Sequence, residues 1–401
     1  MFGTLADTSN FLLPTRAASI AAEIDWLTWF IVWVCIIFGG IVFLGTVYIA
    51  IRFRHRKGGP ERGSGATHST FLEIFWSVIP AVICLMIAIW GFQGYVRFNV
   101  QPPGEALEIL VEGQKWSWTF TYPNGLREQV LHIPKDVPVR FVLSSTDVIH
   151  SLYFPEFRIK KDVVPGRYNK MWVTATEVST VLDGSPLSKG IEAWSDPDNF
   201  VFDTGVDKIN EPQDGFDIYC AEYCGTKHAK MLSKVYVHPT QASFNQWLAN
   251  ASDPFRADSK GNRTPTTKIG QKLSNNNGCF SCHTVDGGKG IGPTWKDMFG
   301  KQGTFADGTA YTADENYIRE SIEYPNKHVV AGFNPAMPTY LGKIKPAEYT
   351  AIMSYMKSIS ANFKGSSAEL DLPPAEIIER DKKAGGANAP ATQPAAPATQ
   401  P

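Results

Sequence analysis

The chain has 401 residues and a formal net charge of -1, with 38 Lys and Arg side chains against 39 Asp and Glu. This balance shows no global basic excess, so we expect no nucleic-acid partner. A chain of this length is expected to form two or three domains. Of its six cysteines, Cys35 and Cys84 lie inside apolar runs and the other four form two close pairs, which leaves none for a structural disulfide framework.

Two long apolar runs near the N-terminus predict a membrane anchor. Residues 26–51 contain no charged side chain and exceed the roughly 20 residues that cross a bilayer, and a second uncharged run covers 74–96. The loop between them is rich in Arg and Lys, and such loops stay in the cytoplasm. We therefore expect a transmembrane helical hairpin over 26–96. We also expect an external N-terminal segment over 1–25 without signal-peptide features, and exported domains after residue 97.

Residues 107–173 alternate between apolar and polar side chains, with turn signals at about ten-residue spacing. This pattern predicts an antiparallel β-sandwich or barrel, and cupredoxin folds are such sandwiches. His150 lies at the end of an apolar strand. We expect this domain to cover 97–248. Its segment 177–214 carries nine acidic side chains against two lysines, so we interpret it as either a solvated loop or a docking surface.

Four soft or borderline metal ligands follow at fixed intervals: Cys220, Cys224, His228 and Met231. Two thiolates, an imidazole and a thioether form a ligand set that selects copper, and zinc sites rarely recruit a methionine. The spacing also differs from that of common zinc fingers. The sequence therefore predicts a copper site, with a Cys220–Cys224 disulfide or a zinc site as the alternatives.

A polar stretch over 249–267 predicts a flexible linker, and a Cys-x2-Cys-His motif follows it. Cys279, Cys282 and His283 form the attachment signature of a c-type haem, with His283 as the proximal iron ligand. A redox-active cysteine pair is the alternative. We expect a cytochrome domain over 268–364.

The sixth haem ligand is expected to be a thioether, because a thioether raises the haem potential and suits an electron carrier. Met337, in a Met-Pro context, is the first candidate, and Met298 and His328 are weaker ones. After residue 364 the chain becomes rich in Pro and Ala and loses apolar periodicity, which predicts a disordered tail over 365–401.

Together these motifs resemble subunit II of cytochrome c oxidase with a fused C-terminal cytochrome c domain, as in the caa-type haem-copper oxidases. The resemblance implies a multidomain membrane protein: a two-helix transmembrane hairpin, an all-β cupredoxin sandwich and an all-α class I cytochrome c domain. It also implies a binuclear copper centre, CuA, bridged by Cys220 and Cys224. The remaining copper ligands would be His150, His228, Met231 and the backbone carbonyl of Glu222.

The resemblance implies three further roles. The Glu222 side chain would bind a magnesium ion at the boundary with oxidase subunit I. Glu73, three residues before Trp76, would lie at the mouth of a proton-uptake channel, although an acidic side chain also suits a helix N-terminus. Trp116 would receive electrons at the surface, with ordinary packing as the alternative. Ser117 stands where the family usually has a tyrosine, which weakens the role of Trp116.

A protein of this kind would pass electrons from the haem to CuA and on to subunit I, which reduces oxygen to water and pumps protons. We expect subunits I and III as partners, and a quinol-oxidising complex or a cytochrome c as donor. The expected location is a bacterial inner membrane, with the redox domains on the periplasmic side. The CuA subunit of a nitric oxide reductase is the alternative, and a membrane-tethered electron carrier is a third hypothesis.

Opposite charges predict how the two redox domains meet. Residues 97–252 carry 15 Lys and Arg against 19 Asp and Glu, a balance of -4, whereas residues 254–365 carry 14 against 9, a balance of +5. Complementary fields steer an encounter and fix its orientation. We therefore expect the acidic segment 177–214 to cradle the cytochrome domain near Trp116.

Overall fold

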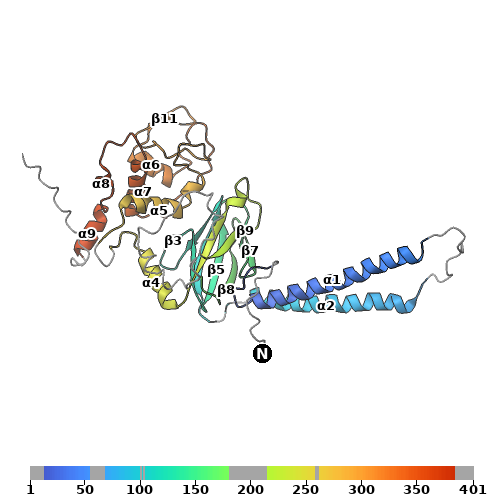
Figure 1. Ribbon diagram of the computed structural model, residues 1–401. Helices are drawn as coiled ribbons and strands as arrows, with labels where there is room; N and C mark the ends of the chain where they lie inside the picture. The colour runs from blue at the N-terminus through green and yellow to red at the C-terminus, as the bar shows by residue number, and fades with distance from the viewer. Residues whose placement is uncertain are drawn as a thin grey trace, which may run out of the picture.

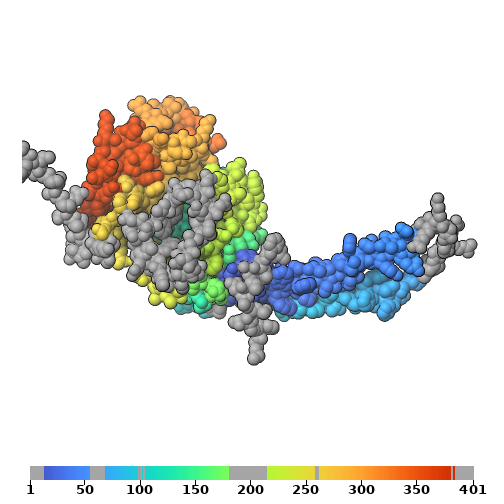
Figure 2. Space-filling view, viewed as in Figure 1, coloured from blue at the N-terminus to red at the C-terminus, as the bar shows by residue number. Residues whose placement is uncertain are grey.

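The computed structural model describes residues 13–54, 68–99, 102, 104–179, 215–257 and 262–383. Most of the acidic segment 177–214 is not among them, so the cradle expected there lies outside the described residues. The described chain has three parts: a helical hairpin, a β-sandwich and a helical C-terminal domain (Figure 1). The sandwich lies between the other two, and the C-terminal domain sits directly against it in the space-filling view (Figure 2).

Helices α1 (Ala21–Arg52) and α2 (Thr70–Asn99) form the hairpin, which projects away from the sandwich (Figure 1). Both helices are long and apolar enough to cross a membrane. Each extends several residues beyond the expected spans, 26–51 and 74–96. Helical hydrogen bonding continues through the flanking polar residues, which a search for uncharged runs does not count.

Two five-stranded sheets form the sandwich, in the strand orders β3-β2-β1-β5-β8 and β4-β10-β9-β6-β7. Neighbouring strands pair antiparallel, except that β1 pairs parallel with β5 and β4 parallel with β10. The large buried side chains of the core come from both sheets, which confirms the predicted all-β sandwich. The strands are β1 (Leu107–Gln114), β2 (Ser117–Thr121), β3 (Arg127–Glu128), β4 (Leu131–Pro134), β5 (Pro138–Ser145), β6 (His150–Phe154), β7 (Ile159–Val163), β8 (Asn169–Thr174), β9 (Phe216–Cys220) and β10 (Leu232–His238).

The chain after the sandwich is packed rather than free. Helix α4 (Gln241–Ala251) lies against the sandwich, and Phe255 beyond it is only 5% exposed. The flexible linker predicted over 249–267 is therefore wrong for the described residues, because one aromatic side chain anchors the polar stretch to the next domain. Its apolar neighbours there are Ala257, Ile269, Ala347, Ala351 and Ile377.

The C-terminal domain is mainly helical, as predicted for a cytochrome c domain. Helices α5 and α7 cross so closely that a Cβ atom on Gly270 would lie 1.9 Å from the carbonyl oxygen of Ala351. Only glycine fits at this crossing. The elements are α5 (Thr266–Asn276), η4 (Cys279–Ser281), β11 (Gln302–Thr304), β12 (Ala310–Thr312), α6 (Glu315–Glu323) and α7 (Pro346–Ser358).

Two more helices follow, α8 (Ser367–Leu370) and α9 (Ala375–Lys383). Ile377 of α9 is buried, and Nη1 of Arg380 lies 2.8 Å from Oδ2 of Asp253. The disordered tail predicted over 365–401 is therefore wrong up to residue 383. A few apolar side chains anchor short helices that the average composition of the tail conceals.

A buried carboxylate joins the hairpin to the sandwich. Asp25 of α1 is 2% exposed. Its Oδ1 accepts a hydrogen bond from Nε of Arg158 at 2.8 Å, and its Oδ2 accepts one from Nε of Arg16 at 2.7 Å. Arg158 lies in the turn between β6 and β7. This ion-pair cluster therefore fixes the direction in which α1 leaves the sandwich.

We expect Asp25→Ala to lower the free energy of unfolding by about 3 kcal/mol, because it leaves the buried Arg158 without its main carboxylate partner. The matched control is Glu23→Ala. It removes a pair with Arg97 whose two side chains are 49% and 63% exposed, and it should cost at most about 1 kcal/mol. Thermal unfolding of the detergent-solubilised chain measures both variants. Equal losses would contradict the role assigned to Asp25.

Two histidines are buried against each other on the side of the sandwich that α4 covers. His132 of β4 is 2% exposed and His238 of β10 is 1% exposed, and Nδ1 of His132 lies 3.0 Å from Nε2 of His238. The ring of Trp247 stacks on His132 with centroids 3.9 Å apart. Burial lowers the pKa of both imidazoles, that of His238 to about 4. Both rings are therefore neutral near pH 7.

The free energy of unfolding should fall as the pH drops from 6.5 to about 4. In this window the unfolded state protonates His238 and the folded state does not, so the full stability is present above pH 6.5. For His238 this amounts to roughly 3 kcal/mol. Denaturant titrations at several pH values measure the loss, and His238→Gln should reduce it. An unchanged pH profile in that variant would count against the assignment.

Candidate copper and haem sites

The four ligands predicted between β9 and β10 gather around two sulfur atoms. We call residues 220–231 the copper loop. The Sγ atoms of Cys220 and Cys224 lie 3.8 Å apart, and both cysteines are free thiols. Nδ1 of His228, in the turn η3 (His228–Lys230), lies 3.5 Å from Sγ of Cys224. Sδ of Met231 lies 3.8 Å from the same sulfur.

The adjacent strand β6 brings His150 to this loop. Leu152 pairs with Cys220 across β6 and β9, so His150 lies beside the sulfur cluster, with its Nδ1 3.8 Å from Sγ of Cys220. Its Nε2 lies 2.8 Å from Oδ1 of Asp147, and such a carboxylate orients a ligating imidazole. The backbone oxygen of Glu222 is 3.3 Å from Sγ of Cys220, while the Glu222 side chain is exposed.

The site disfavours the state in which both cysteines are ionised. Burial raises the pKa of Cys224 to about 12, and the charge of the neighbouring Cys220 adds to this effect. At Cys220 burial also favours the thiol, but hydrogen bonds with His150 and the backbone outweigh it and lower the pKa to about 7. Thiolates are the metal-binding form, so a cation would displace the remaining proton. Two sulfurs, two imidazoles and a thioether fit copper better than zinc.

Trp116 packs against the copper loop. A Cβ atom on Gly225 would lie 3.2 Å from Cζ2 of Trp116, and Gly225 has φ +123°, a value that favours glycine. Glycine therefore lets the indole ring lie directly on the loop. Trp118 is buried, and its ring meets that of His150 edge to face with centroids 6.0 Å apart. The two tryptophans thus contact different parts of the copper site.

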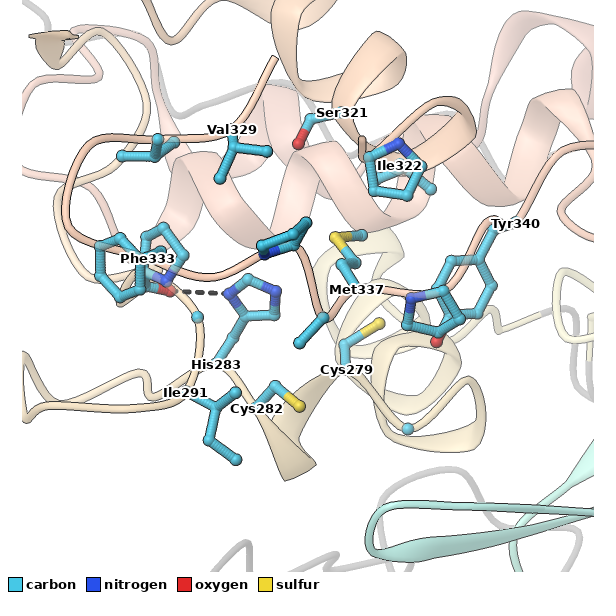
Figure 3. A pocket seen from close by; sticks show the side chains of 18 of the residues that line it. Cys279, Cys282, His283, Ile291, Ser321, Ile322, Val329, Phe333, Met337 and Tyr340 are labelled. Carbon is cyan, nitrogen blue, oxygen red and sulfur yellow. Dashed lines mark hydrogen bonds between the residues drawn. The ribbon is translucent and has the colours of Figure 1, made fainter. Parts of the chain in front are cut away.

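A cavity of about 630 Å³ lies beside the Cys-x2-Cys-His motif. Cys279, Cys282, His283 and Met337 surround it (Figure 3). The Nδ1 of His283 donates a hydrogen bond to the carbonyl oxygen of Pro293 at 2.7 Å, because that oxygen can only accept. This leaves Nε2 of His283 to bind a metal. Two thiols and an oriented imidazole beside an apolar cavity fit a covalently attached haem.

All three predicted candidates for the sixth ligand, Met337, Met298 and His328, line this cavity. Tyr340, which was not predicted, also lines this cavity. Its hydroxyl donates a hydrogen bond to the carbonyl oxygen of Asn277 at 2.6 Å. A tyrosine outside any motif carries no signal that distinguishes it from an ordinary core residue.

The sandwich closes part of the haem cavity. Gly278, directly before the haem motif, approaches the sandwich so closely that a Cβ atom on it would lie 2.5 Å from Nε2 of Gln114. Two ion pairs flank this contact, Lys343 with Glu112 and Lys272 with Glu128, each at 3.4 Å. Basic side chains of the cytochrome domain therefore meet acidic side chains of the sandwich. The sandwich residues that line the cavity are Gln114, Lys115, Trp116, Thr146 and Asp147.

Glu73 lies far from both sites. It is exposed in the first turn of α2, at the end of the hairpin away from the sandwich (Figure 1). The structure thus gathers the predicted copper ligands into one cluster and the predicted haem residues around one cavity, with Trp116 between them. Glu73 lies apart from both, in the first turn of α2.

Comparison with known proteins identifies all three parts. Family models for the transmembrane and periplasmic domains of cytochrome C oxidase subunit II match residues 6–93 and 126–185, and a cytochrome c model matches 267–360. Cytochrome c oxidase subunit 2 of Alkalihalophilus pseudofirmus is 26% identical over 327 residues, which cover 80% of this chain and 82% of the relative. The same subunit of Synechocystis is 26% identical over 291 residues, covering 61% and 77%. The solved periplasmic domain of subunit II from Bradyrhizobium japonicum is 21% identical, covers 38% of this chain and 98% of that one, and gives a TM-score of 0.28.

The matched segments follow the order of the hairpin, the sandwich and the cytochrome domain. They imply a membrane-anchored chain with a periplasmic domain, a CuA centre and a haem c. The nitric oxide reductase alternative is not favoured, because the relatives are subunits of cytochrome c oxidase. The chain therefore belongs to the subunit II family of cytochrome c oxidases, carries a cytochrome c domain fused to its C-terminal side, and serves in a haem-copper oxidase.

Proposed function

We propose that electrons enter this chain at haem c, pass to CuA and leave to a separate subunit I, which reduces oxygen to water and pumps protons. One observation carries the proposal: Trp116 and Asp147 line the haem cavity and also contact the copper site. Trp116 packs on Gly225 of the copper loop, and Asp147 hydrogen-bonds to His150. Haem and copper are one-electron carriers, and these side chains would hold them close together and exclude water between them.

The ligand roles are those that the resemblance to the family implies, and the donor geometry supports them. Cys220 and Cys224 would hold the copper pair through their thiolates. The exposed Glu222 carboxylate would bind magnesium at the boundary with subunit I. The other ligands would be His150, His228, Met231 and the Glu222 carbonyl, whose donor atoms lie between 3.3 and 3.8 Å from one of the two sulfurs.

The haem would be attached through Cys279 and Cys282, and His283 and Met337 would be the two side chains that ligate its iron. A thioether at that position raises the haem potential. The hydrogen bond from His283 to Pro293 supports this arrangement, because it orients the ring and leaves Nε2 available.

The chain would lie in a bacterial inner membrane with its redox domains on the periplasmic side, because the basic loop between the helices stays in the cytoplasm. The apolar surface of α1 and α2 requires lipid or neighbouring subunits around it. We propose subunits I and III as these neighbours. A quinol-oxidising complex or a cytochrome c would donate electrons to the haem.

The purified complex tests this function. After a flash reduces haem c, CuA should be reduced in turn, and the complex should consume oxygen. Nitric oxide consumption measured on the same sample is the comparison. A haem c that cannot reduce CuA would defeat the proposed electron path, and nitric oxide turnover without oxygen turnover would restore the alternative function.

Cys224→Ser should abolish the near-infrared absorption of CuA and leave the c-haem spectrum unchanged, because it removes a bridging thiolate. The control is Cys35→Ser, which removes a free thiol from α1 and should leave both spectra intact. Absorption spectroscopy of the purified chain measures both. Retention of the CuA band in Cys224→Ser would rule out the assigned bridge.

Met337→Ala should remove the thioether-to-iron charge-transfer band and lower the haem potential. Met298→Ala changes a methionine in the same cavity wall and should leave the band in place. Redox titration followed by absorption spectroscopy distinguishes them. Loss of the band only in Met298→Ala would exchange the two assignments.

Glu73 is proposed to sit at the mouth of a proton-uptake route. Glu73→Gln should slow oxygen reduction several-fold, because it removes an ionisable group that would pass protons into the membrane-spanning part of the complex. Neither cofactor spectrum should change. Glu23→Gln, in the first turn of α1 at the opposite end of the hairpin, should not. Stopped-flow proton uptake measures the difference. Normal uptake in Glu73→Gln would leave only a helix-stabilising role.

A further inference from the structure

Lys227 lies in the copper loop between the ligand candidates Cys224 and His228, yet no ligand role falls on it. Its Nζ donates a hydrogen bond to the carbonyl oxygen of Ser281 at 2.9 Å. Ser281 is one of the two residues between the haem-attachment cysteines and directly precedes Cys282. The same Nζ lies 5.7 Å from the ring centroid of Trp116. One ammonium group therefore connects the copper loop, the indole ring and the haem-attachment turn.

We propose that Lys227 is a positioning residue that holds the haem-attachment turn against the copper loop. The proposal rests on the electron path given above, since it concerns how the haem and the copper pair are kept in one productive arrangement. Lys227 holds the haem domain, the electron donor, by its hydrogen bond to the backbone carbonyl of Ser281. Because Lys227 itself belongs to the copper loop, the same bond ties the haem-attachment turn to the electron acceptor.

The sign of the charges argues for a specific contact rather than general attraction. Residues 254–365, which include the cytochrome domain, carry a balance of +5 from 14 Lys and Arg against 9 Asp and Glu. Such a surface repels a lysine of the sandwich at long range. The flanking pairs have the opposite polarity, with Lys343 and Lys272 of the cytochrome domain facing Glu112 and Glu128. Lys227 therefore stabilises the interface through its directed hydrogen bond and its contact with Trp116, and it does so despite the positive charge of the cytochrome domain.

The two kinds of contact have different geometric effects. The ion pairs are partly exposed, are screened by salt and tolerate rotation of one domain on the other. A hydrogen bond to a backbone carbonyl in a one-turn segment fixes both position and direction. It acts close to Gly278, where the cytochrome backbone already touches Gln114. Lys227 therefore sets the orientation of the haem-attachment turn once the ion pairs have brought the domains together.

The experiment measures the rate of electron transfer from haem c to CuA after a flash, in the complete purified complex. Lys227→Ala should slow this transfer about three- to tenfold, the range expected when a hydrogen bond from a charged but exposed group is lost. Lys227→Arg should restore most of the rate, because a guanidinium can still donate to the carbonyl. The matched control is Lys230→Ala, which removes the same charge from the same loop and should leave the rate unchanged or raise it.

A second readout separates positioning from other effects. The potentials and spectra of both cofactors should remain those of the parent complex, and the slowing should persist at every salt concentration. If alanine disturbs copper loading, Lys227→Gln replaces it, because the shorter amide also fails to span the contact. Electron transfer as fast in Lys227→Ala and Lys227→Gln as in the parent complex would overturn the inference. Absence of transfer in the parent complex would instead overturn the proposed electron path.

Discussion

Two sulfur atoms held 3.8 Å apart in a site closed to solvent are the constraint on which the copper domain depends. Cys220 and Cys224 are 8% and 4% exposed. Burial disfavours the charged form of each, and the charge of one disfavours that of the other. A cation that binds both sulfurs would displace the proton that Cys224 retains. The paired strands β6, β9 and β10 position the two cysteines and His150, and Asp147 hydrogen-bonds to the imidazole of His150.

Much of this arrangement could be predicted from the sequence, because the informative residues are close together along the chain. The copper loop and the haem motif are local patterns, and the two apolar helices are long enough to stand out. His150 was predictable only because its neighbours resemble a known ligand strand. The structure explains its place through the pairing of Leu152 with Cys220.

Contacts between distant segments could not be predicted in the same way. Phe255 is a single aromatic residue in a polar stretch, and Ile377 lies in a tail rich in Pro and Ala, yet both are buried in one cluster. Lys227 resembles any exposed loop lysine until the carbonyl of Ser281 lies opposite it. Such contacts depend on which surfaces meet, and that depends on the three-dimensional packing of whole domains rather than on any local pattern.

Gly278, the residue before the haem motif, lies where the cytochrome domain meets the sandwich. At Gly278 even one methyl group would collide with Gln114 and with Ser117, whose Oγ would lie 2.8 Å from it. A larger residue would press against these two side chains and favour a wider separation of the domains, and it would then lengthen the proposed electron path from haem to copper. Glycine at position 278 thus lets the two redox domains approach closely at this contact.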